Sequence, residues 1–228
     1  MSSSAPAAAA FKDLCIDAVD AGAAARFWAP ALGLRATVRA SGYLLSDDVQ
    51  EHRVWVNAVT EPKSAKLRVH LDVYVAAVSE LTALGATVLQ DQQRWTVLAD
   101  PEGAELCAFV RPPDEVPDYR LYELVVDAAD PERLALWWGA RFGVALDADP
   151  EDESWALEGA PSPPWPVVFG AVPEPKTEKN RVHWDVWGDA RELTAAGATL
   201  LRQRDDEIAW DVLADPEGNE FCVFARPE

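Results

Sequence analysis

The sequence predicts an α+β fold made of four βαβββ modules, two in each half of the chain, with cupped mixed sheets backed by helices. Two repeated stretches are the first evidence: Lys66–Val73 returns as Lys179–Val186 with six of eight positions identical, and Trp95–Cys107 returns as Trp210–Cys222. The second is that each half twice shows one helix-like segment between strand-like runs. Repetition at an offset of about 110 to 115 residues in a chain of 228 indicates a duplication into two domains.

The predicted domain boundaries follow composition. Residues 11–111 and 119–228 form the two domains, and the proline- and acid-rich stretch 112–118 is the linker between them. The small, alanine-rich segment 1–10 is expected to be a disordered tail, because it has no basic start before an apolar stretch and so does not resemble a signal peptide. No apolar run approaches the ~20 residues of a membrane span. We therefore expect a cytoplasmic protein.

The net charge limits which classes of partner the chain can bind, and the cysteines indicate whether disulfides are expected. The chain has 39 acidic and 20 basic residues, a net charge of -19. Such a surface repels phosphate backbones and anionic lipids, so neither nucleic acid nor a membrane is an expected partner. The three cysteines are an odd set, and Cys107 and Cys222 are repeat-equivalent, which argues against a disulfide framework.

Each half opens with a strand and then a helix. Alternating polar and apolar residues predict the two strands, and the helices show an aspartate N-cap and a glycine stop. Large aromatic residues late in these helices are expected to pack against the sheet. The predicted elements are strand 11–19, N-cap Asp20, Phe27, Trp28 and Gly33 in the first half, and strand 121–128, N-cap Asp130, Trp137, Trp138 and Gly143 in the second.

The remaining elements repeat in the same order. Strand-like runs precede the Lys-x-Arg-Val-His strand in each half, and a short helix, a strand and a final hairpin follow it. The Asp-Pro-Glu-Gly sequence of that hairpin fits a type I turn, with proline second and glycine fourth. The predicted ranges are strands 37–45, 53–59, 87–89, 155–157, 165–171 and 199–201, helices 76–84 and 190–196, and a loop at 160–166.

Alternation along the Lys-x-Arg-Val-His strands separates a polar face from an apolar one. The apolar face must pack on the helices, so the polar face lies across the open side of the sheet. It combines acids, a histidine, a thiol and aromatic rings, which together describe a ligand site. A histidine and an aspartate two apart also hydrogen-bond one another in purely structural settings, and that interpretation stays open. The residues on this face include Arg68, His70, Asp72, Tyr74, Glu105, Cys107 and Phe109, and Arg181, His183, Asp185, Trp187, Glu220, Cys222 and Phe224, with Asp13, Cys15 and Asp17 or Glu123, Val125 and Asp127 from the first strands.

These features resemble the vicinal oxygen chelate superfamily, in particular its glyoxalase-like and bleomycin-resistance-like proteins, here with two tandem domains. The resemblance covers residues 11–111 and 119–226, and the final Trp-x-Val-Leu-Ala-Asp-Pro-Glu-Gly-x-Glu-x-Cys hairpin carries most of it. It implies a cup-shaped sheet that holds a small molecule. In many members it also implies a divalent metal bound by His and Glu from four strands.

The metal pattern of the family is incomplete in this sequence. His70 and His183 match the fifth-strand histidine, but the last-strand glutamate is replaced by Cys107 and Cys222. The first-strand position falls on Asp13 or Glu123, and the fourth-strand position on Asn57 or on Gly170, which has no donor. A mixed His, thiolate and carboxylate set can hold zinc, whereas Mg, Mn or Fe(II) prefer harder donors. We therefore assign no metal ligand and no cofactor, with a divalent metal as the alternative.

The leading hypothesis is a small-molecule binding protein of the drug- or natural-product-sequestering type, since ten tryptophans offer rigid surface for a planar ligand. One alternative is an enzyme of the superfamily, a lyase, isomerase or dioxygenase, with histidine as the acid-base group and aspartate orienting it. Another is a structural or regulatory module with vestigial pockets. A tandem chain is expected to act as a monomeric pseudo-dimer or a homodimer. The candidate catalytic residues are His70, Asp72, His183 and Asp185, and the candidate ligand-binding residues are Asp17, Trp55, Tyr74, Trp95, Glu105, Cys107, Asp127, Trp165, Trp187, Trp210, Glu220 and Cys222.

Overall fold

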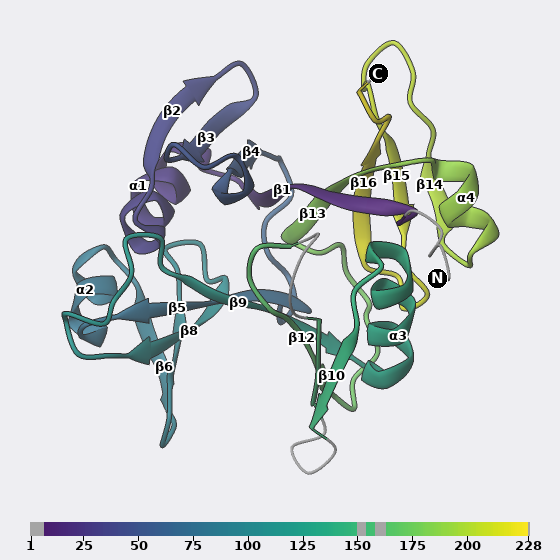
Figure 1. Ribbon diagram of the computed structural model, residues 1–228. Helices are drawn as coiled ribbons and strands as arrows, with labels where there is room; N and C mark the ends of the chain where they lie inside the picture. The colour runs from purple at the N-terminus through teal and green to yellow at the C-terminus, as the bar shows by residue number, and fades with distance from the viewer. Residues whose placement is uncertain (1–6, 150–153, 158–162, 228) are drawn as a thin grey trace. The chain divides into compact units, whose positions relative to one another are not determined.

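The computed structural model describes residues 7–149, 154–157 and 163–227, and its strands form two eight-stranded mixed sheets (Figure 1). The chain divides into two compact units. We call Asp13–Val125 together with Asn180–Val182 the N-half unit. The C-half unit consists of the residues up to Lys12, Val126–Lys179 and His183–Glu228. None of the helices in the described ranges is long and apolar enough to cross a membrane.

The N-half unit contains two successive βαβββ modules, as the sequence predicts. In each module the first strand pairs in parallel with the last one, and the other neighbours are antiparallel, in the orders β1-β4-β3-β2 and β5-β8-β7-β6. The elements are β1 (Ala9–Ala18), α1 (Ala21–Leu32), β2 (Arg35–Arg39), β3 (Gly42–Ser46), a 3-10 turn (Gln50–His52), β4 (Val54–Ala58), β5 (Val69–Val75), α2 (Val78–Ala83), β6 (Thr87–Asp91), β7 (Thr96–Ala99) and β8 (Glu105–Val110).

The C-half unit repeats the pattern, with neighbours β10-β11-β12-β9 and β14-β15-β16-β13. Its elements are β9 (Leu121–Ala128), α3 (Pro131–Phe142), β10 (Leu146–Asp149), β11 (Ser154–Leu157), β12 (Val167–Ala171), β13 (Val182–Gly188), α4 (Ala190–Ala195), β14 (Thr199–Arg202), β15 (Asp211–Ala214) and β16 (Glu220–Phe224). The ends of β1, β9 and β13 belong to different units, because a unit boundary falls within each of these strands.

The structure differs from the predicted strands in three places. The single strand expected at 37–45 is two strands, β2 and β3, which turn back on each other before Gly42. Strand β10 was not predicted, because its Leu-Asp-Ala-Asp sequence has little β-propensity. Strand β1 begins at Ala9, inside the segment expected to be a tail, whose first six residues lie outside the described part of the chain. Of the predicted loop at 160–166, residues 160–162 also lie outside it.

The opening helices begin and end where the sequence predicts. Asp20 accepts a hydrogen bond from the Ala23 amide, and Asp130 accepts one from Arg133. Gly33 ends α1 in the left-handed region at φ 73°. A Cβ at Gly33 would lie 1.8 Å from the Asp118 carbonyl oxygen, so no other residue fits there.

The predicted helix aromatics form the core between helix and sheet. Phe27 and Trp28 are each 1% exposed, and Trp138 is fully buried. Trp137 is only half-buried, and its indole N–H donates to the Ala196 carbonyl at 2.8 Å. Burial of these large rings supplies much of the apolar area that holds the helices on the sheets.

A buried aspartate in each final hairpin connects that hairpin to the opening helix of the same half. Asp100 Oδ2 accepts from Trp28 Nε1 at 3.0 Å, while its Oδ1 accepts from the backbone N–H of Glu102 and Ala104. Asp215 Oδ2 accepts from Trp138 Nε1 at 3.2 Å in the second half. We call Asp100 and Asp215 the turn anchors.

The glutamate of the same turn binds the start of the helix. Glu102 accepts from the backbone N–H groups of Val19 and Asp20 at 2.9 and 2.5 Å. Glu217 accepts from Ala129 and Asp130 at 2.7 and 2.6 Å. The Asp-Pro-Glu-Gly sequence thus has a structural role. Its Asp and Glu side chains accept hydrogen bonds from backbone donors and join segments about 70 to 90 residues apart.

Loss of one anchor hydrogen bond should destabilise the protein. Trp138→Phe removes the indole donor to a buried carboxylate and should lower the free energy of unfolding by about 1.5–3 kcal/mol, measured by urea denaturation. The matched control is Trp137→Phe, whose indole donates to a neutral carbonyl and should cost about 0.5–1.5 kcal/mol. Equal costs for the two variants would contradict the role assigned to Asp215.

The turn anchors should also shape the pH dependence of stability. Burial raises the pKa of Asp215, although hydrogen bonds from Asn219 and Trp138 act to lower it. The folded-state pKa of Asp215 therefore lies above its unfolded-state pKa. Its contribution to stability is fully present below the unfolded-state pKa and is lost as the pH rises through the folded-state pKa. We expect the stability advantage of wild type over Asp215→Asn to shrink between pH 4 and pH 7 in urea titrations. An advantage that grows with pH is the contrary result.

Candidate functional site

In the N-half unit the register of β5 and β8 brings the predicted residues together. Asp72 lies opposite Cys107, and Tyr74 lies opposite Phe109. His70 Nε2 lies 3.4 Å from Asp72 Oδ1, and the ligand atoms of His70, Asp72 and Cys107 all lie within 4.8 Å of one another. The polar face predicted from alternation therefore exists, with an imidazole, a carboxylate and a thiol side by side.

Beside this trio runs a row of rings, which we call the N-half aromatic row. It comprises Trp95, Phe109, Tyr122 and Tyr74. Tyr74 and Tyr122 are stacked with centroids 4.5 Å apart, Phe109 and Tyr122 meet edge-on at 5.0 Å, and Trp95 stacks on Phe109 at 5.9 Å. All four rings are half-buried, so each keeps some surface in contact with solvent.

Two residues of this neighbourhood were missed by sequence analysis. Tyr122 comes from β9, and the Arg111 guanidinium lies 5.0 Å from the centre of the Tyr74 ring. Strict alternation would group Tyr122 with buried Leu124 and Val126. Instead the half-buried pair Tyr122 and Glu123 interrupts the alternation. The sequence signal for Tyr122 was the pair of consecutive polar residues, Tyr122 and Glu123, in a strand that otherwise alternates.

The Tyr122 hydroxyl stays protonated over the physiological range. Burial is the largest cause that raises the pKa of Tyr122 to about 12, and the Glu123 and Tyr74 side chains add to it. Its hydroxyl therefore acts as a hydrogen-bond donor and not as a phenolate base near neutral pH.

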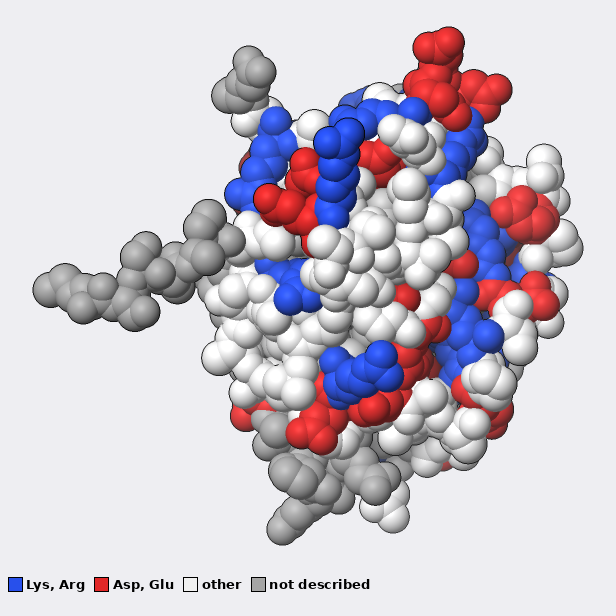
Figure 2. Space-filling view, turned by 90° about the vertical axis from the view of Figure 1, so that its right-hand side faces the viewer, with Lys and Arg blue, Asp and Glu red and all other residues white. Residues whose placement is uncertain are grey.

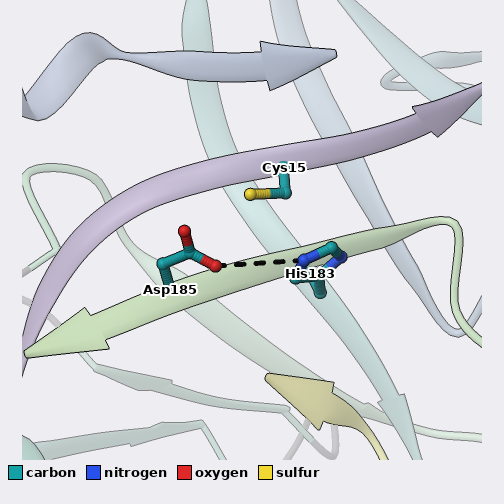
Figure 3. Close-up of side chains that lie close together, drawn as sticks. All are labelled: Cys15, His183 and Asp185. Carbon is teal, nitrogen blue, oxygen red and sulfur yellow. Dashed lines mark ion pairs between the residues drawn. The ribbon is translucent and has the colours of Figure 1, made fainter. Parts of the chain in front are cut away.

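The C-half unit places the equivalent trio on β13 and β16. His183 Nε2 lies 3.9 Å from Asp185 Oδ1 and 3.8 Å from Cys222 Sγ. Figure 3 shows His183 and Asp185 along β13 with their ion pair dashed. Asp185 pairs in register with Cys222, as Asp72 does with Cys107. Duplication has thus preserved the spatial arrangement and not only the sequence.

A second set of rings, the C-half aromatic row, accompanies this trio. Trp210 stacks on Phe224 at 5.2 Å, and Trp187 meets Phe224 edge-on at 6.0 Å. Lys12 was missed by sequence analysis: its Nζ lies 4.1 Å from the centre of the Phe224 ring and 3.7 Å from Asp185 Oδ2. In the repeat, Lys12 corresponds to Tyr122, so one unit has an ammonium where the other has a phenol.

The predicted glutamates are engaged by lysines. Glu105 Oε1 pairs with Lys63 Nζ at 2.9 Å, and its other oxygen accepts from the Leu67 amide. Glu220 pairs with Lys176 at 2.8 Å. These pairs connect the last strand of each half to the segment before the histidine strand, which is a structural task. Their part in ligand binding stays a prediction.

The other predicted residues have varied environments. Asp17 is buried and accepts from Asn57 Nδ2 at 3.2 Å, and Asp127 is also buried. Trp55 is half-buried and pairs in register with Cys15. Trp165 is 5% exposed and meets Phe11 edge-on at 5.2 Å, so the contacts described here place it in the core and in neither aromatic row.

The donors of the N-half trio do not fit the metal that the family resemblance implies. Magnesium, manganese and ferrous sites favour several hard oxygen or imidazole donors around the ion. In this chain the last-strand donor is a thiol, Cys107, and the fourth-strand position of the first half is Asn57, whose amide donates to Asp17. No catalytic step through such a metal follows from these residues.

Surface charge is mixed on the face that Figure 2 shows. Lysine and arginine side chains lie beside aspartate and glutamate side chains there, around an uncharged central area. On this face acidic side chains are therefore interspersed with basic ones and do not gather into one acidic pole.

Comparison with known proteins gives one matching family. The model described as "Glyoxalase-like domain" matches residues 13–109 and again residues 123–224. No sequence among the curated proteins gives a significant match.

Solved structures with a similar fold share little sequence identity with this chain. Glyoxalase I from Zea mays shares 12% identity with a TM-score of 0.66, and the match covers 95% of this chain and 92% of that one. A putative dioxygenase from Bacillus subtilis shares 12% identity with a TM-score of 0.65, over 99% of this chain and 87% of that one. At such identities the likeness concerns the fold alone.

Proposed function

Since the chain belongs to the glyoxalase-like domain family, with two tandem copies of the domain, we propose that it is a metal-independent small-molecule binding protein for flat, ring-bearing compounds. The compounds are of the drug or natural-product kind. Binding uses the two aromatic rows, and the adjoining His and Asp side chains orient polar groups of the ligand.

The observation that supports this proposal is the half-buried state of every ring in both rows. Tyr74, Phe109, Trp187, Trp210 and Phe224 all contact another ring and still keep some surface accessible. Rings held by their neighbours lose little conformational entropy when a planar ligand stacks on them. Core residues would be buried on both faces.

Cations beside the rows favour ligands with an anionic or electron-rich group. Arg111 lies over Tyr74 in one unit, and Lys12 lies over Phe224 in the other. Each cation is fixed near a ring whose free surface a ligand can share, so ring stacking and charge pairing act on the same molecule.

A second candidate function is catalysis by the His–Asp pairs, in an isomerase, lyase or dioxygenase of this superfamily. The observation in its favour is that Asp72 is 4% exposed and lies beside His70 Nε2. A buried carboxylate orients an imidazole and stabilises its protonated form, as proton transfer requires. Turnover of a bound ligand, lost in both His70→Gln and Asp72→Asn, would establish this candidate over simple binding.

Ring-bearing ligands should quench tryptophan fluorescence, and row variants should weaken that binding. Trp95→Leu and Trp210→Leu each remove a stacking surface worth about 1–2 kcal/mol, which corresponds to a roughly 5- to 30-fold rise in Kd. Titration of a panel of aromatic compounds against the purified protein gives these values, with calorimetry to confirm them where a tryptophan is removed.

Trp137→Leu is the control for this experiment, because Trp137 lies on α3 outside both aromatic rows. It should leave Kd unchanged within twofold while lowering stability. Equal losses in Trp137→Leu and Trp210→Leu would attribute the effect to instability and overturn the stacking site.

Metal removal should not affect binding. We expect exhaustive treatment with a chelator to leave the affinity for an aromatic ligand unchanged, since rings and cations provide the contacts. Elemental analysis before and after treatment checks that any metal has been removed. A loss of affinity that added Mn²⁺ or Zn²⁺ restores would contradict metal-independent binding.

A further inference from the structure

The geometry points to a covalent capture site in the C-half unit: Cys222 is a nucleophile that adds to a soft, ring-bearing Michael acceptor docked on the C-half aromatic row. This inference rests on the proposed function, because it requires a ligand held by Trp187, Trp210 and Phe224. It goes further by naming the reacting atom and the chemical class of the ligand, an α,β-unsaturated carbonyl compound attached to an aromatic ring.

Four functional groups follow one another in this unit. Cys222 Sγ lies 3.8 Å from His183 Nε2, His183 Nε2 lies 3.9 Å from Asp185 Oδ1, and Asp185 Oδ2 lies 3.7 Å from Lys12 Nζ. The order is thiol, imidazole, carboxylate and ammonium. An imidazole within reach of a thiol is the arrangement that generates a thiolate, and the neighbouring carboxylate stabilises the resulting imidazolium.

Accessibility distinguishes Cys222 from the other thiols. Cys222 is half-buried, whereas Cys15 is 3% exposed and Cys107 is 8% exposed. Thiol alkylation requires both a thiolate and an approach path, so only Cys222 among the three combines an imidazole contact with solvent access.

The ring contacts place the ligand beside the sulfur. Cys222 and Phe224 are two residues apart on β16, so their side chains leave the same face of the strand. Trp187 and Trp210 flank Phe224 on that face. An aromatic ring stacked on this row therefore holds an attached alkene near Sγ, which raises its effective concentration at the thiol.

The chemical step is balanced without a further reactant. His183 Nε2 takes the proton of the Cys222 thiol, and the sulfur forms a bond to the β-carbon of the alkene while the π pair shifts to the carbonyl oxygen as an enolate. The Lys12 ammonium stabilises that oxyanion. The imidazolium then returns the proton to the α-carbon, so the product is the saturated thioether and His183 is neutral again.

N-phenylmaleimide is the probe for this step, and N-phenylsuccinimide, its saturated counterpart, measures binding alone. We expect N-phenylsuccinimide to quench tryptophan fluorescence. The rate of adduct formation with N-phenylmaleimide should saturate with concentration, and N-phenylsuccinimide should slow it competitively. Peptide mapping by mass spectrometry should find the adduct on Cys222 at least tenfold faster than on Cys15 or Cys107, which serve as internal references.

Two comparisons isolate the contributions of the rings and of His183. With rates normalised to those of N-acetylcysteine, N-methylmaleimide should react at least tenfold more slowly than N-phenylmaleimide, because it lacks the ring. His183→Gln should slow addition roughly 100-fold at saturating N-phenylmaleimide, where a change in affinity no longer affects the rate, and His183→Asn is the second variant if the first does not fold.

Each outcome supports or overturns a specific proposal. If N-phenylsuccinimide binds, but labelling of Cys222 is linear in probe concentration and unchanged in His183→Gln, the covalent step is overturned while ligand binding stands. If N-phenylsuccinimide does not bind and the normalised rates of the two maleimides are equal, both the capture site and the aromatic binding site of this unit are overturned. First labelling at Cys107 also overturns the assignment.

Discussion

A buried carboxylate that accepts hydrogen bonds from both a hairpin and a distant indole determines the architecture of each half. Asp100 and Asp215 lie where a chain reversal leaves backbone donors facing the interior, and they satisfy those donors together with the tryptophan of the opening helix. Desolvation of the carboxylate opposes this arrangement, as the raised pKa of each residue indicates. The arrangement persists because the donors converge on it, and removal of the carboxylate would leave them unsatisfied inside the protein.

The glutamate two residues later makes the connection specific. Glu102 and Glu217 bind the backbone just before the opening helices, so the first and last elements of each half are joined at a fixed place. With both ends fixed, the histidine strand between them presents its polar side chains beside the last strand in a defined register. The same constraint acts twice, which explains why the two His, Asp and Cys trios have nearly the same geometry.

Local patterns in the sequence predicted the module order, the helix caps and the polar face, because alternation, capping residues and glycine stops act over a few residues. The contacts of Asp100 and Glu102 could not be predicted that way, since their partners lie 72 to 83 residues away. Lys12 and Tyr122 were missed because alternation assigned them to the apolar side. Their places beside Phe224 and Tyr74 depend on a local irregularity and on tertiary pairing. Trp165 is 5% exposed, so tryptophan content alone does not distinguish a ligand surface from core.

The turn anchors and the aromatic rows involve separate sets of side chains. No ring of either row donates to Asp100 or Asp215 among the hydrogen bonds described, and the tryptophans that do so belong to the helices. Substitutions in the rows therefore remove none of the indole hydrogen bonds to the turn anchors. For protein engineers, the proposed binding function would then offer two separate rows, one of which can be re-specified by directed evolution while its duplicate keeps the parental selectivity.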